Sequence, residues 1–375
     1  MPEPTIALPA VLPTVRIVDE TMREGMQIED AAIPTTAKVE LLDALSATGL
    51  RHLVVGSFVS PRWVPQMADV EEILARFTPA AGVEYTALVL NDKGAERRAR
   101  YVPPLTVDAR PRLTVHACDV FVQRNTHRTQ TDEIAAWPKV VAAAQEAGAR
   151  TATVRLGAAF GSNWTGDVAV ADGLALIERM MRAWEDAGIA VDTVWLGDPM
   201  GWTHPLRMET YVQEILARWP GVAHLHLHLH DQRGAALVSA WTALRLLPPH
   251  TTLTIDAAVG GIGGCPYCGN GRATGMIPTE DLVDLLEESR IDTGVDRDRL
   301  IEVALLAART VGRPLHGRLP LAGPRPRGAR LYPMDMPFVE THEQAAHFRL
   351  GPSAYAGAPS PWRAPITSAQ RQETP

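Results

Sequence analysis

Short segments rich in β-branched residues alternate with longer amphipathic segments along most of this chain, which limits the folds open to it. The short segments have the length of strands, and the longer ones show the periodicity of helices packed on one face. We expect strands at Val15–Asp19, His52–Gly56, Glu84–Leu90, Arg112–Ala117, Thr151–Arg155, Val191–Gly197, Val222–His230 and Thr252–Ala257. We expect helices at Thr36–Ala47, Ala68–Arg76, Thr131–Ala147, Ala171–Ala187, Leu206–Trp219, Ala235–Leu246 and Arg297–Val311.

Repeated alternation of this kind, over about 270 residues, is typical of an α/β protein of the (β/α)₈ TIM-barrel type. An open doubly wound sheet is the alternative, but it usually has a glycine-rich dinucleotide-binding loop after its first strand. This chain has Glu20-Thr-Met-Arg-Glu24 there, so we prefer the barrel. We assign residues 1–290 to the catalytic barrel. Residues 291–375 form a C-terminal helical and loop extension that packs on the barrel or on a neighbouring subunit.

The composition narrows the possible partners. A formal net charge of −7 argues against nucleic acid, because nucleic-acid-binding domains are normally basic. We find no apolar run of about 18 residues and so expect no transmembrane helix and no membrane partner. Only three cysteines occur, whereas a secreted disulfide scaffold carries more. We therefore expect a cytoplasmic protein that acts on a small molecule. We also expect a homodimer.

The first cluster of polar residues follows the first expected strand and reads Asp19-Glu-Thr-Met-Arg-Glu-Gly-Met-Gln27. In a parallel barrel, active-site residues lie where strands end. An arginine next to an acid and a glycine fits a metal ligand, Glu24, beside an oxyanion-stabilising group, Arg23. A surface turn with solvated charges explains this cluster equally well.

The second cluster is His224-Leu-His-Leu-His-Leu-His230-Asp231. Because side chains alternate along a strand, the four histidines share one face and the leucines the other. In a barrel the leucines would pack on helices and the histidines would point inward. Neutral imidazole is the commonest protein metal ligand, so His228 and His230, at the end of the strand, can chelate a cation. The two deeper histidines fit hydrogen-bonded core residues better.

The third cluster follows the last strand and reads Gly260-Gly-Ile-Gly-Gly-Cys265-Pro-Tyr-Cys268. Its glycines suit a loop that closes over a ligand. Two cysteines at this spacing supply only half of a structural zinc site, and we find no second pair. A redox motif of this type belongs to a small fold, which this chain is not. We therefore favour a catalytic thiol, Cys265.

Together these clusters resemble the metal-dependent TIM-barrel lyases and synthases, the pyruvate carboxyltransferase-like superfamily, which includes 3-hydroxy-3-methylglutaryl-CoA lyase, isopropylmalate synthase and homocitrate synthase. The resemblance covers about Val15 to Leu285 and is greatest to the lyase branch. It rests on two long segments, Ser57-Phe-Val-Ser-Pro-Arg-Trp-Val-Pro-Gln-Met67 and Gly263-Gly-Cys-Pro-Tyr267.

The resemblance implies specific roles. Arg23 would stabilise an enolate oxygen, and Cys265 would exchange a proton with the departing carbon. Glu24, His228 and His230 would hold a divalent metal, Mg²⁺ or Mn²⁺ in preference to Zn²⁺ or Co²⁺. Asp231 would orient a histidine ligand.

Three positions depart from the lyase pattern. The lyases have Asp where this chain has Glu24, which is the residue of homocitrate synthases. They have a functional glutamate where this chain has Val54, and a metal-approaching asparagine near the position of Met276. The base that takes the substrate's hydroxyl proton must therefore be another group, and Asp19, Asp198 or a histidine of the seventh strand could serve.

Three functions remain open. The first is retro-aldol or retro-Claisen cleavage of a 3-hydroxy-3-methylglutaryl-CoA-like acyl-CoA through an enolate, with Asp19 as a third catalytic residue. The second is condensation of an acyl-CoA with a 2-oxo-acid. The third is a barrel that only binds a metal or an acyl-CoA. Residues expected to contact the acyl-CoA or the hydroxy- or oxo-acid are Gln27, Ser57, Asn91, Arg155 and Asp198.

Overall fold

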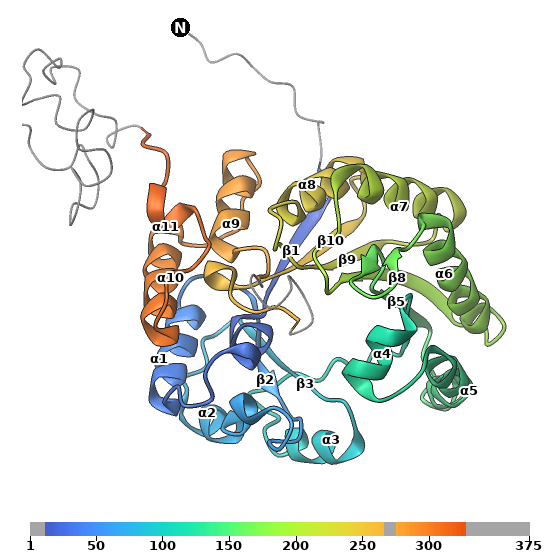
Figure 1. The fold of residues 1–375 in the computed structure, drawn as a ribbon, viewed down its shortest axis with the longest axis horizontal. Helices are drawn as coiled ribbons and strands as arrows, with labels where there is room; N and C mark the ends of the chain where they lie inside the picture. The colour runs from blue at the N-terminus through green and yellow to red at the C-terminus, as the bar shows by residue number, and fades with distance from the viewer. Residues whose placement is uncertain (1–11, 266–274, 328–375) are drawn as a thin grey trace, which may run out of the picture. The chain divides into compact units, whose positions relative to one another are not determined.

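Eight parallel strands form the centre of the protein in a computed structural model that describes residues 12–265 and 275–327. In the sheet their order is β3-β2-β1-β10-β9-β8-β5-β4, and helices surround it (Figure 1). This arrangement confirms the expected TIM-barrel class. The strands are β1 (Thr14–Asp19), β2 (His52–Ser57), β3 (Glu84–Leu88), β4 (Arg112–His116), β5 (Thr151–Gly157), β8 (Ala190–Asp198), β9 (His224–Leu229) and β10 (Thr252–Ala257).

The ends of the sheet are β3 and β4, and no ladder joins them among the residues that the structure describes. Neighbouring strands otherwise follow the chain order of a barrel. The one addition is a short antiparallel hairpin, β6 (Gly161–Ser162) and β7 (Gly166–Asp167), in the loop after β5. The carboxyl ends of all eight strands therefore meet on one side, where the three polar clusters lie.

The helices pack their apolar faces on the outside of the sheet. They are α1 (Thr35–Ser46), α2 (Val70–Arg76), α3 (Asp92–Ala99), α4 (Asp119–Thr126), α5 (Gln130–Glu146), α6 (Val170–Glu185), α7 (Pro205–Arg218), α8 (Ala236–Leu246), α9 (Thr279–Glu288), α10 (Arg297–Val311) and α11 (Leu319–Ala322). Among these, α3, α4, α9 and α11 were not among the expected segments. No helix of the described residues is long and apolar enough to cross a membrane.

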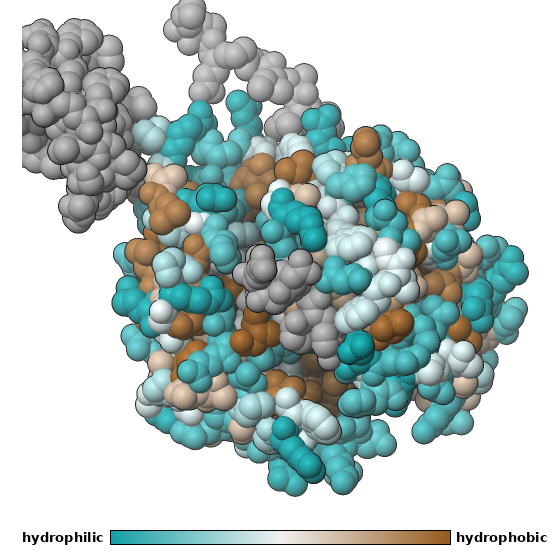
Figure 2. Space-filling model, viewed as in Figure 1, coloured by the Kyte–Doolittle hydropathy of each residue, from teal (hydrophilic) through white to brown (hydrophobic). Residues whose placement is uncertain are grey.

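Side-chain alternation in β9 separates the core from the barrel interior. Leu225, Leu227 and Leu229 are fully buried in the apolar cluster that joins the strands to α6, α7 and α8. The intervening histidines face inward and are only partly buried. On the face seen in Figure 2, hydrophilic residues predominate and apolar residues lie in scattered patches between them. The apolar side chains of β9 therefore pack between the sheet and the surrounding helices, while its histidines face the inside of the barrel.

The chain continues past α9 into α10, which packs against α1 and α9. The compact unit that contains the barrel extends to Gly323. The expected extension at residues 291–375 stays a prediction as a separate unit, because residues 328–375 lie outside the described part of the chain.

Candidate metal centre and active site

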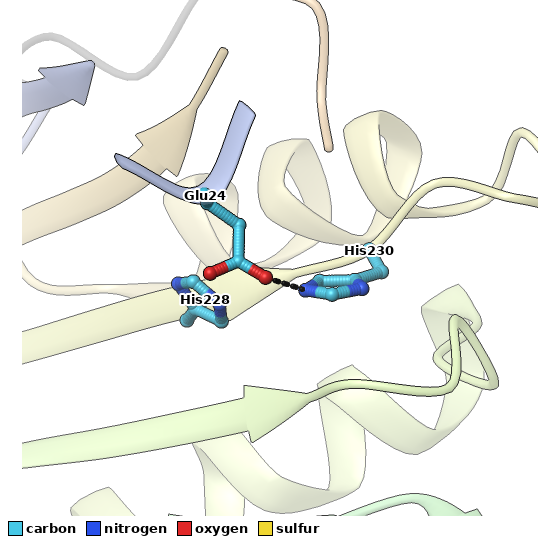
Figure 3. A group of neighbouring side chains, drawn as sticks. All are labelled: Glu24, His228 and His230. Carbon is cyan, nitrogen blue, oxygen red and sulfur yellow. Dashed lines mark ion pairs between the residues drawn. The ribbon is translucent and has the colours of Figure 1, made fainter. Parts of the chain in front are cut away.

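Glu24, His228 and His230 come together at the carboxyl ends of the strands (Figure 3). Glu24 lies in the turn Thr21–Gly25 (η1) after β1, His228 lies near the end of β9, and His230 follows it. One ligand atom from each residue lies within 4.8 Å of those of the other two. Glu24 Oε1 is 3.7 Å from His230 Nε2. The structure thus brings together the three residues that the sequence singled out.

This donor set fits a divalent cation. Ligands at about 2.1 Å around an octahedral ion lie about 3 to 4 Å from one another, which matches the separation of Glu24 and His230. Burial lowers the pKa of His230 to about 3, so its imidazole is neutral, as a metal ligand must be. Burial raises the pKa of Glu24, but Arg23 and the two histidines outweigh it and keep that pKa below its usual value. The carboxylate is therefore ionised near neutral pH.

Asp256 of β10 fixes the orientation of His228. Its Oδ2 lies 2.7 Å from His228 Nδ1 and its Oδ1 lies 2.6 Å from His226 Nε2. This leaves His228 Nε2 for a metal, an arrangement common in protein metal sites. The same bond raises the pKa of His228 against the effect of burial. The bond to His226 confirms that this deeper histidine is a hydrogen-bonded core residue.

Asp231, which we expected to orient a ligand, has a different role. Its Oδ1 accepts a hydrogen bond of 2.7 Å from the backbone N–H of Ala236 and so holds the start of α8. The expected role of Asp231 was wrong because a residue next to a ligand in sequence need not contact it once the strand has ended. Asp231 lies past the end of β9 and bonds the start of α8, whereas Asp256 on the neighbouring strand bonds His228.

Arg23 and Glu20 add two charges beside the centre. Arg23 forms an ion pair with Glu24 and lies 3.8 Å from Glu20 Oε2. Glu20, which the sequence analysis did not select, is buried, and its Oε2 has no hydrogen-bond partner in the described part of the chain. Burial raises the pKa of Glu20 to about 7, although Arg23 opposes this effect. Glu20, His228 and Asp256 form a second close group of possible ligand atoms.

Trp195 of β8 also escaped sequence analysis. Its ring stacks on that of His228, with centroids 5.5 Å apart and an angle of 25° between the planes. A Cβ atom on Gly197 would lie 2.3 Å from the Trp195 ring, so glycine is needed there for this packing. Arg155 Cζ of β5 lies 4.1 Å from the centre of the Trp195 ring. Arg155 thus points into the barrel, close to the metal centre.

Cys265 reaches the centre through the loop that follows β10. Its backbone N–H donates to His230 Nδ1 at 3.3 Å, and the residue is buried beside Cys118 and Met200. Gly263 packs against the backbone of η1, where a Cβ atom would lie 2.7 Å from the carbonyl oxygen of Glu24. The expected catalytic thiol therefore belongs to a residue that contacts a candidate metal ligand. Cys268 lies outside the described residues.

The two aspartates considered as bases are already hydrogen-bonded. Asp19 accepts from Thr21 N at 3.0 Å and from Thr279 Oγ1 at 2.7 Å. Asp198 accepts from Thr203 N at 2.6 Å and thus orders the loop after β8. Burial raises the pKa of each carboxyl to about 6. Both oxygens of Asp19 are thus bonded, which suits a structural role, whereas Asp198 Oδ1 has no hydrogen-bond partner among the described residues.

The other residues expected to contact the substrate differ in burial and in their hydrogen-bond partners. Ser57 is buried at the end of β2, and its Oγ has no hydrogen-bond partner among the described residues. Gln27 is partly buried just after η1. Asn91 is exposed, and its Oδ1 caps α3 by accepting from Gly94 N at 2.9 Å. Ser57 is thus the best placed of the three to meet a ligand.

Val54 and Met276 occupy the positions that depart from the lyase pattern. Leu53 and Val55 belong to the apolar core beneath α1 and α2, whereas the buried Val54 does not, so it faces the interior. Met276 forms a backbone bridge with His230, and its side chain joins the same apolar core. It is therefore not a metal ligand.

Comparison with known proteins gives a consistent result. Residues 14–306 match the family described as HMGL-like. The chain is 30% identical over 304 residues to a hydroxymethylglutaryl-CoA lyase of Bacillus subtilis, covering 81% of this chain and 95% of the relative. It is 34% identical over 325 residues to an (R)-citramalyl-CoA lyase of Chloroflexus aurantiacus, covering 83% and 95%.

A solved structure extends this similarity to three dimensions. An HMG-CoA lyase from Acinetobacter baumannii, in complex with coenzyme A and 3-methylmalate, has a TM-score of 0.68 and 29% identity. The match covers 86% of this chain and 98% of that protein.

Proposed function

Because this chain belongs to the HMGL-like family, we propose that it is a divalent-metal-dependent carbon–carbon lyase. Its substrate is a 3-hydroxy acyl-CoA like 3-hydroxy-3-methylglutaryl-CoA, and its products are an acyl-CoA and a carbonyl compound. The observation that carries this proposal is the meeting of Glu24, His228 and His230 next to Arg23 and the Cys265 loop. A protein that only bound a metal would not need the Arg23 guanidinium and the Cys265 thiol beside it.

The cation supplies Lewis-acid polarisation of the substrate's hydroxyl and carbonyl oxygens when it is bound. Mg²⁺ or Mn²⁺ suits the carboxylate and imidazole donors with positions left for substrate. Arg23 offers a permanent positive charge to the enolate oxygen that develops as the bond breaks. Cys265 donates its thiol proton to the enolate carbon, which yields the acyl-CoA product. Ser57 and Gln27 bind the substrate beside these groups.

Glu20 takes the proton of the tertiary hydroxyl. Both oxygens of Asp19, an earlier candidate, accept hydrogen bonds. Glu20 Oε2 and Asp198 Oδ1 each accept none from the described residues, but Glu20 is the one grouped with the ligand His228 and beside Arg23. A pKa raised by burial to about 7 suits a general base at neutral pH. As the hydroxyl loses its proton, its carbon becomes a carbonyl and the carbon–carbon bond breaks. The bonding pair of electrons then forms the enolate.

Cleavage is favoured over condensation because the relatives described above are lyases. The Acinetobacter structure, which holds coenzyme A, supports a coenzyme A thioester as the substrate class. The homodimer and the cytoplasmic location stay predictions.

The test is turnover of 3-hydroxy-3-methylglutaryl-CoA and citramalyl-CoA by the metal-loaded protein, followed by mass spectrometry of both products. We expect acetyl-CoA from at least one substrate, and loss of most activity in Cys265→Ala with metal binding retained. Full activity in Cys265→Ala would remove the thiol from the mechanism. No cleavage of either thioester, together with release of coenzyme A from acetyl-CoA and a 2-oxo-acid, would support the condensing alternative.

A further inference from the structure

Arg155, Trp195 and His228 form a continuous stack inside the barrel. The parallel register places Arg155 of β5 beside Trp195 of β8, and Trp195 beside His226 of β9. His228 lies one layer closer to the carboxyl ends of the strands, and its ring also stacks on the indole. The Arg155 guanidinium therefore lies over the Trp195 ring, which in turn stacks on the candidate metal ligand His228.

The side chains around this stack are not completely packed. Arg155, Trp195 and His226 are only partly buried, although their strands lie in the middle of the sheet. The residues that alternate with Arg155, Val154 and Leu156, are fully buried in the outer core. The inward-facing side chains of this layer therefore keep accessible surface on which a small polar group can lie.

Arg155 has no carboxylate of its own. In the described part of the chain it forms no ion pair within 4.0 Å, and its buried Nε has no hydrogen-bond partner. The nearby acids are already engaged: Asp256 bonds two histidines, and Glu20 faces Arg23. Burial lowers the pKa of Arg155 to about 10, so it keeps its charge at neutral pH. A charge in such surroundings is costly unless an anion pairs with it.

We propose that Arg155 is a specificity-determining residue that binds the free carboxylate on the acid half of the substrate, the half that leaves as the carbonyl product. The planar guanidinium can bind a carboxylate through two parallel hydrogen bonds, and Trp195 holds its plane in place. Because Arg155 lies below the metal centre, the carboxylate points into the barrel and the thioester points toward its mouth. The proposal rests on the proposed lyase function.

The experiment compares kcat/KM of the wild type and of Arg155→Met on two substrates. The ligands are 3-hydroxy-3-methylglutaryl-CoA and its carboxamide analogue, in which a neutral amide replaces the free carboxylate. We expect Arg155→Met to lower kcat/KM for the acid by about 30-fold or more and for the amide by only a few-fold. Arg155→Lys should recover part of the loss. Equal losses for both ligands would overturn the proposal, because a merely structural residue would not distinguish them.

A binding measurement separates this proposal from the lyase function. Calorimetry with 3-hydroxy-3-methylglutarate and with its monoamide, at saturating Mn²⁺, needs no turnover. Wild type should prefer the diacid and Arg155→Met should not, even if the protein cleaves neither thioester. An unchanged preference in a folded Arg155→Met protein would refute the role. Arg112→Met is the matched control, since Arg112 lies on the adjacent strand β4 with an exposed side chain, and it should behave as wild type.

Discussion

Asp256 is the residue on which the geometry of the metal centre depends, because one carboxylate holds both His226 and His228. Burial alone would raise its pKa, but the two histidines hold that pKa far below its ordinary range. The carboxylate is therefore ionised wherever the protein is folded. It fixes the His228 ring with its other nitrogen free for a metal.

We expect Asp256→Asn to weaken metal binding by about 10- to 100-fold, the usual effect of losing a residue that orients a histidine ligand. Manganese titration followed by electron paramagnetic resonance measures this affinity. Asp231→Asn is the control, because Asp231 follows the ligand pair directly but bonds the start of α8 instead. Weaker binding in Asp231→Asn than in Asp256→Asn would contradict the assignment.

Glu20→Gln tests the proposed base. The amide keeps the shape of the side chain but cannot accept the hydroxyl proton, so we expect kcat to fall by about 10²- to 10⁴-fold. Metal affinity should change little, because the ligands are Glu24, His228 and His230. Steady-state kinetics and manganese titration on the same preparation give both quantities. A parallel loss of metal affinity would make Glu20 a metal ligand instead of a base.

At the scale of elements, Glu280 at the start of α9 holds the loop that follows β10. Its two carboxyl oxygens lie 3.0 and 2.9 Å from the backbone nitrogen of Gly260, at the beginning of the segment that leads to Cys265. Burial raises its pKa from 4.5 to about 8, while the bond from Gly260 opposes the change. The carboxyl is therefore mostly protonated at neutral pH in the folded protein.

The raised pKa of Glu280 predicts a pH dependence of stability. Between pH 4.5 and about 8 the folded protein holds a proton here that the unfolded chain releases. The stabilisation is complete below pH 4.5 and is lost as the pH rises to about 8. We expect Glu280→Gln, which cannot titrate, to show a smaller fall in the urea midpoint between pH 5.5 and 7.5. Glu178→Gln, on the exposed face of α6, should keep the wild-type slope. An unchanged slope in Glu280→Gln would refute the assignment.

The sequence located strands better than it located the site. β-branched segments indicated all eight strands within three residues of their ends, because a buried parallel strand needs that composition. The short helices α3 and α4 escaped notice because they are only eight residues long and carry many polar side chains.

Within the site, the ligand pair of β9 could be predicted because period-two alternation is visible in one segment. Glu20, Trp195 and Asp256 could not, since each is a single residue on, or just after, a different strand. Only the pairing of neighbouring strands brings them to His228, and no local sequence pattern indicates that contact.

At the scale of the whole molecule, metal binding and folding should be coupled but not inseparable. The apolar clusters that unite strands and helices do not include the three ligands, so the barrel can fold without the metal. A metal that binds only the folded state still stabilises it, by about 2.7 kcal/mol at 100 times its dissociation constant.

We therefore expect chelation to abolish lyase activity and leave the far-ultraviolet circular dichroism unchanged. Returning Mg²⁺ or Mn²⁺ should raise the thermal unfolding midpoint by a few degrees in wild type and not in His228→Ala. Loss of secondary structure on chelation would mean that the metal is part of the fold. An equal thermal shift in His228→Ala would place the metal elsewhere.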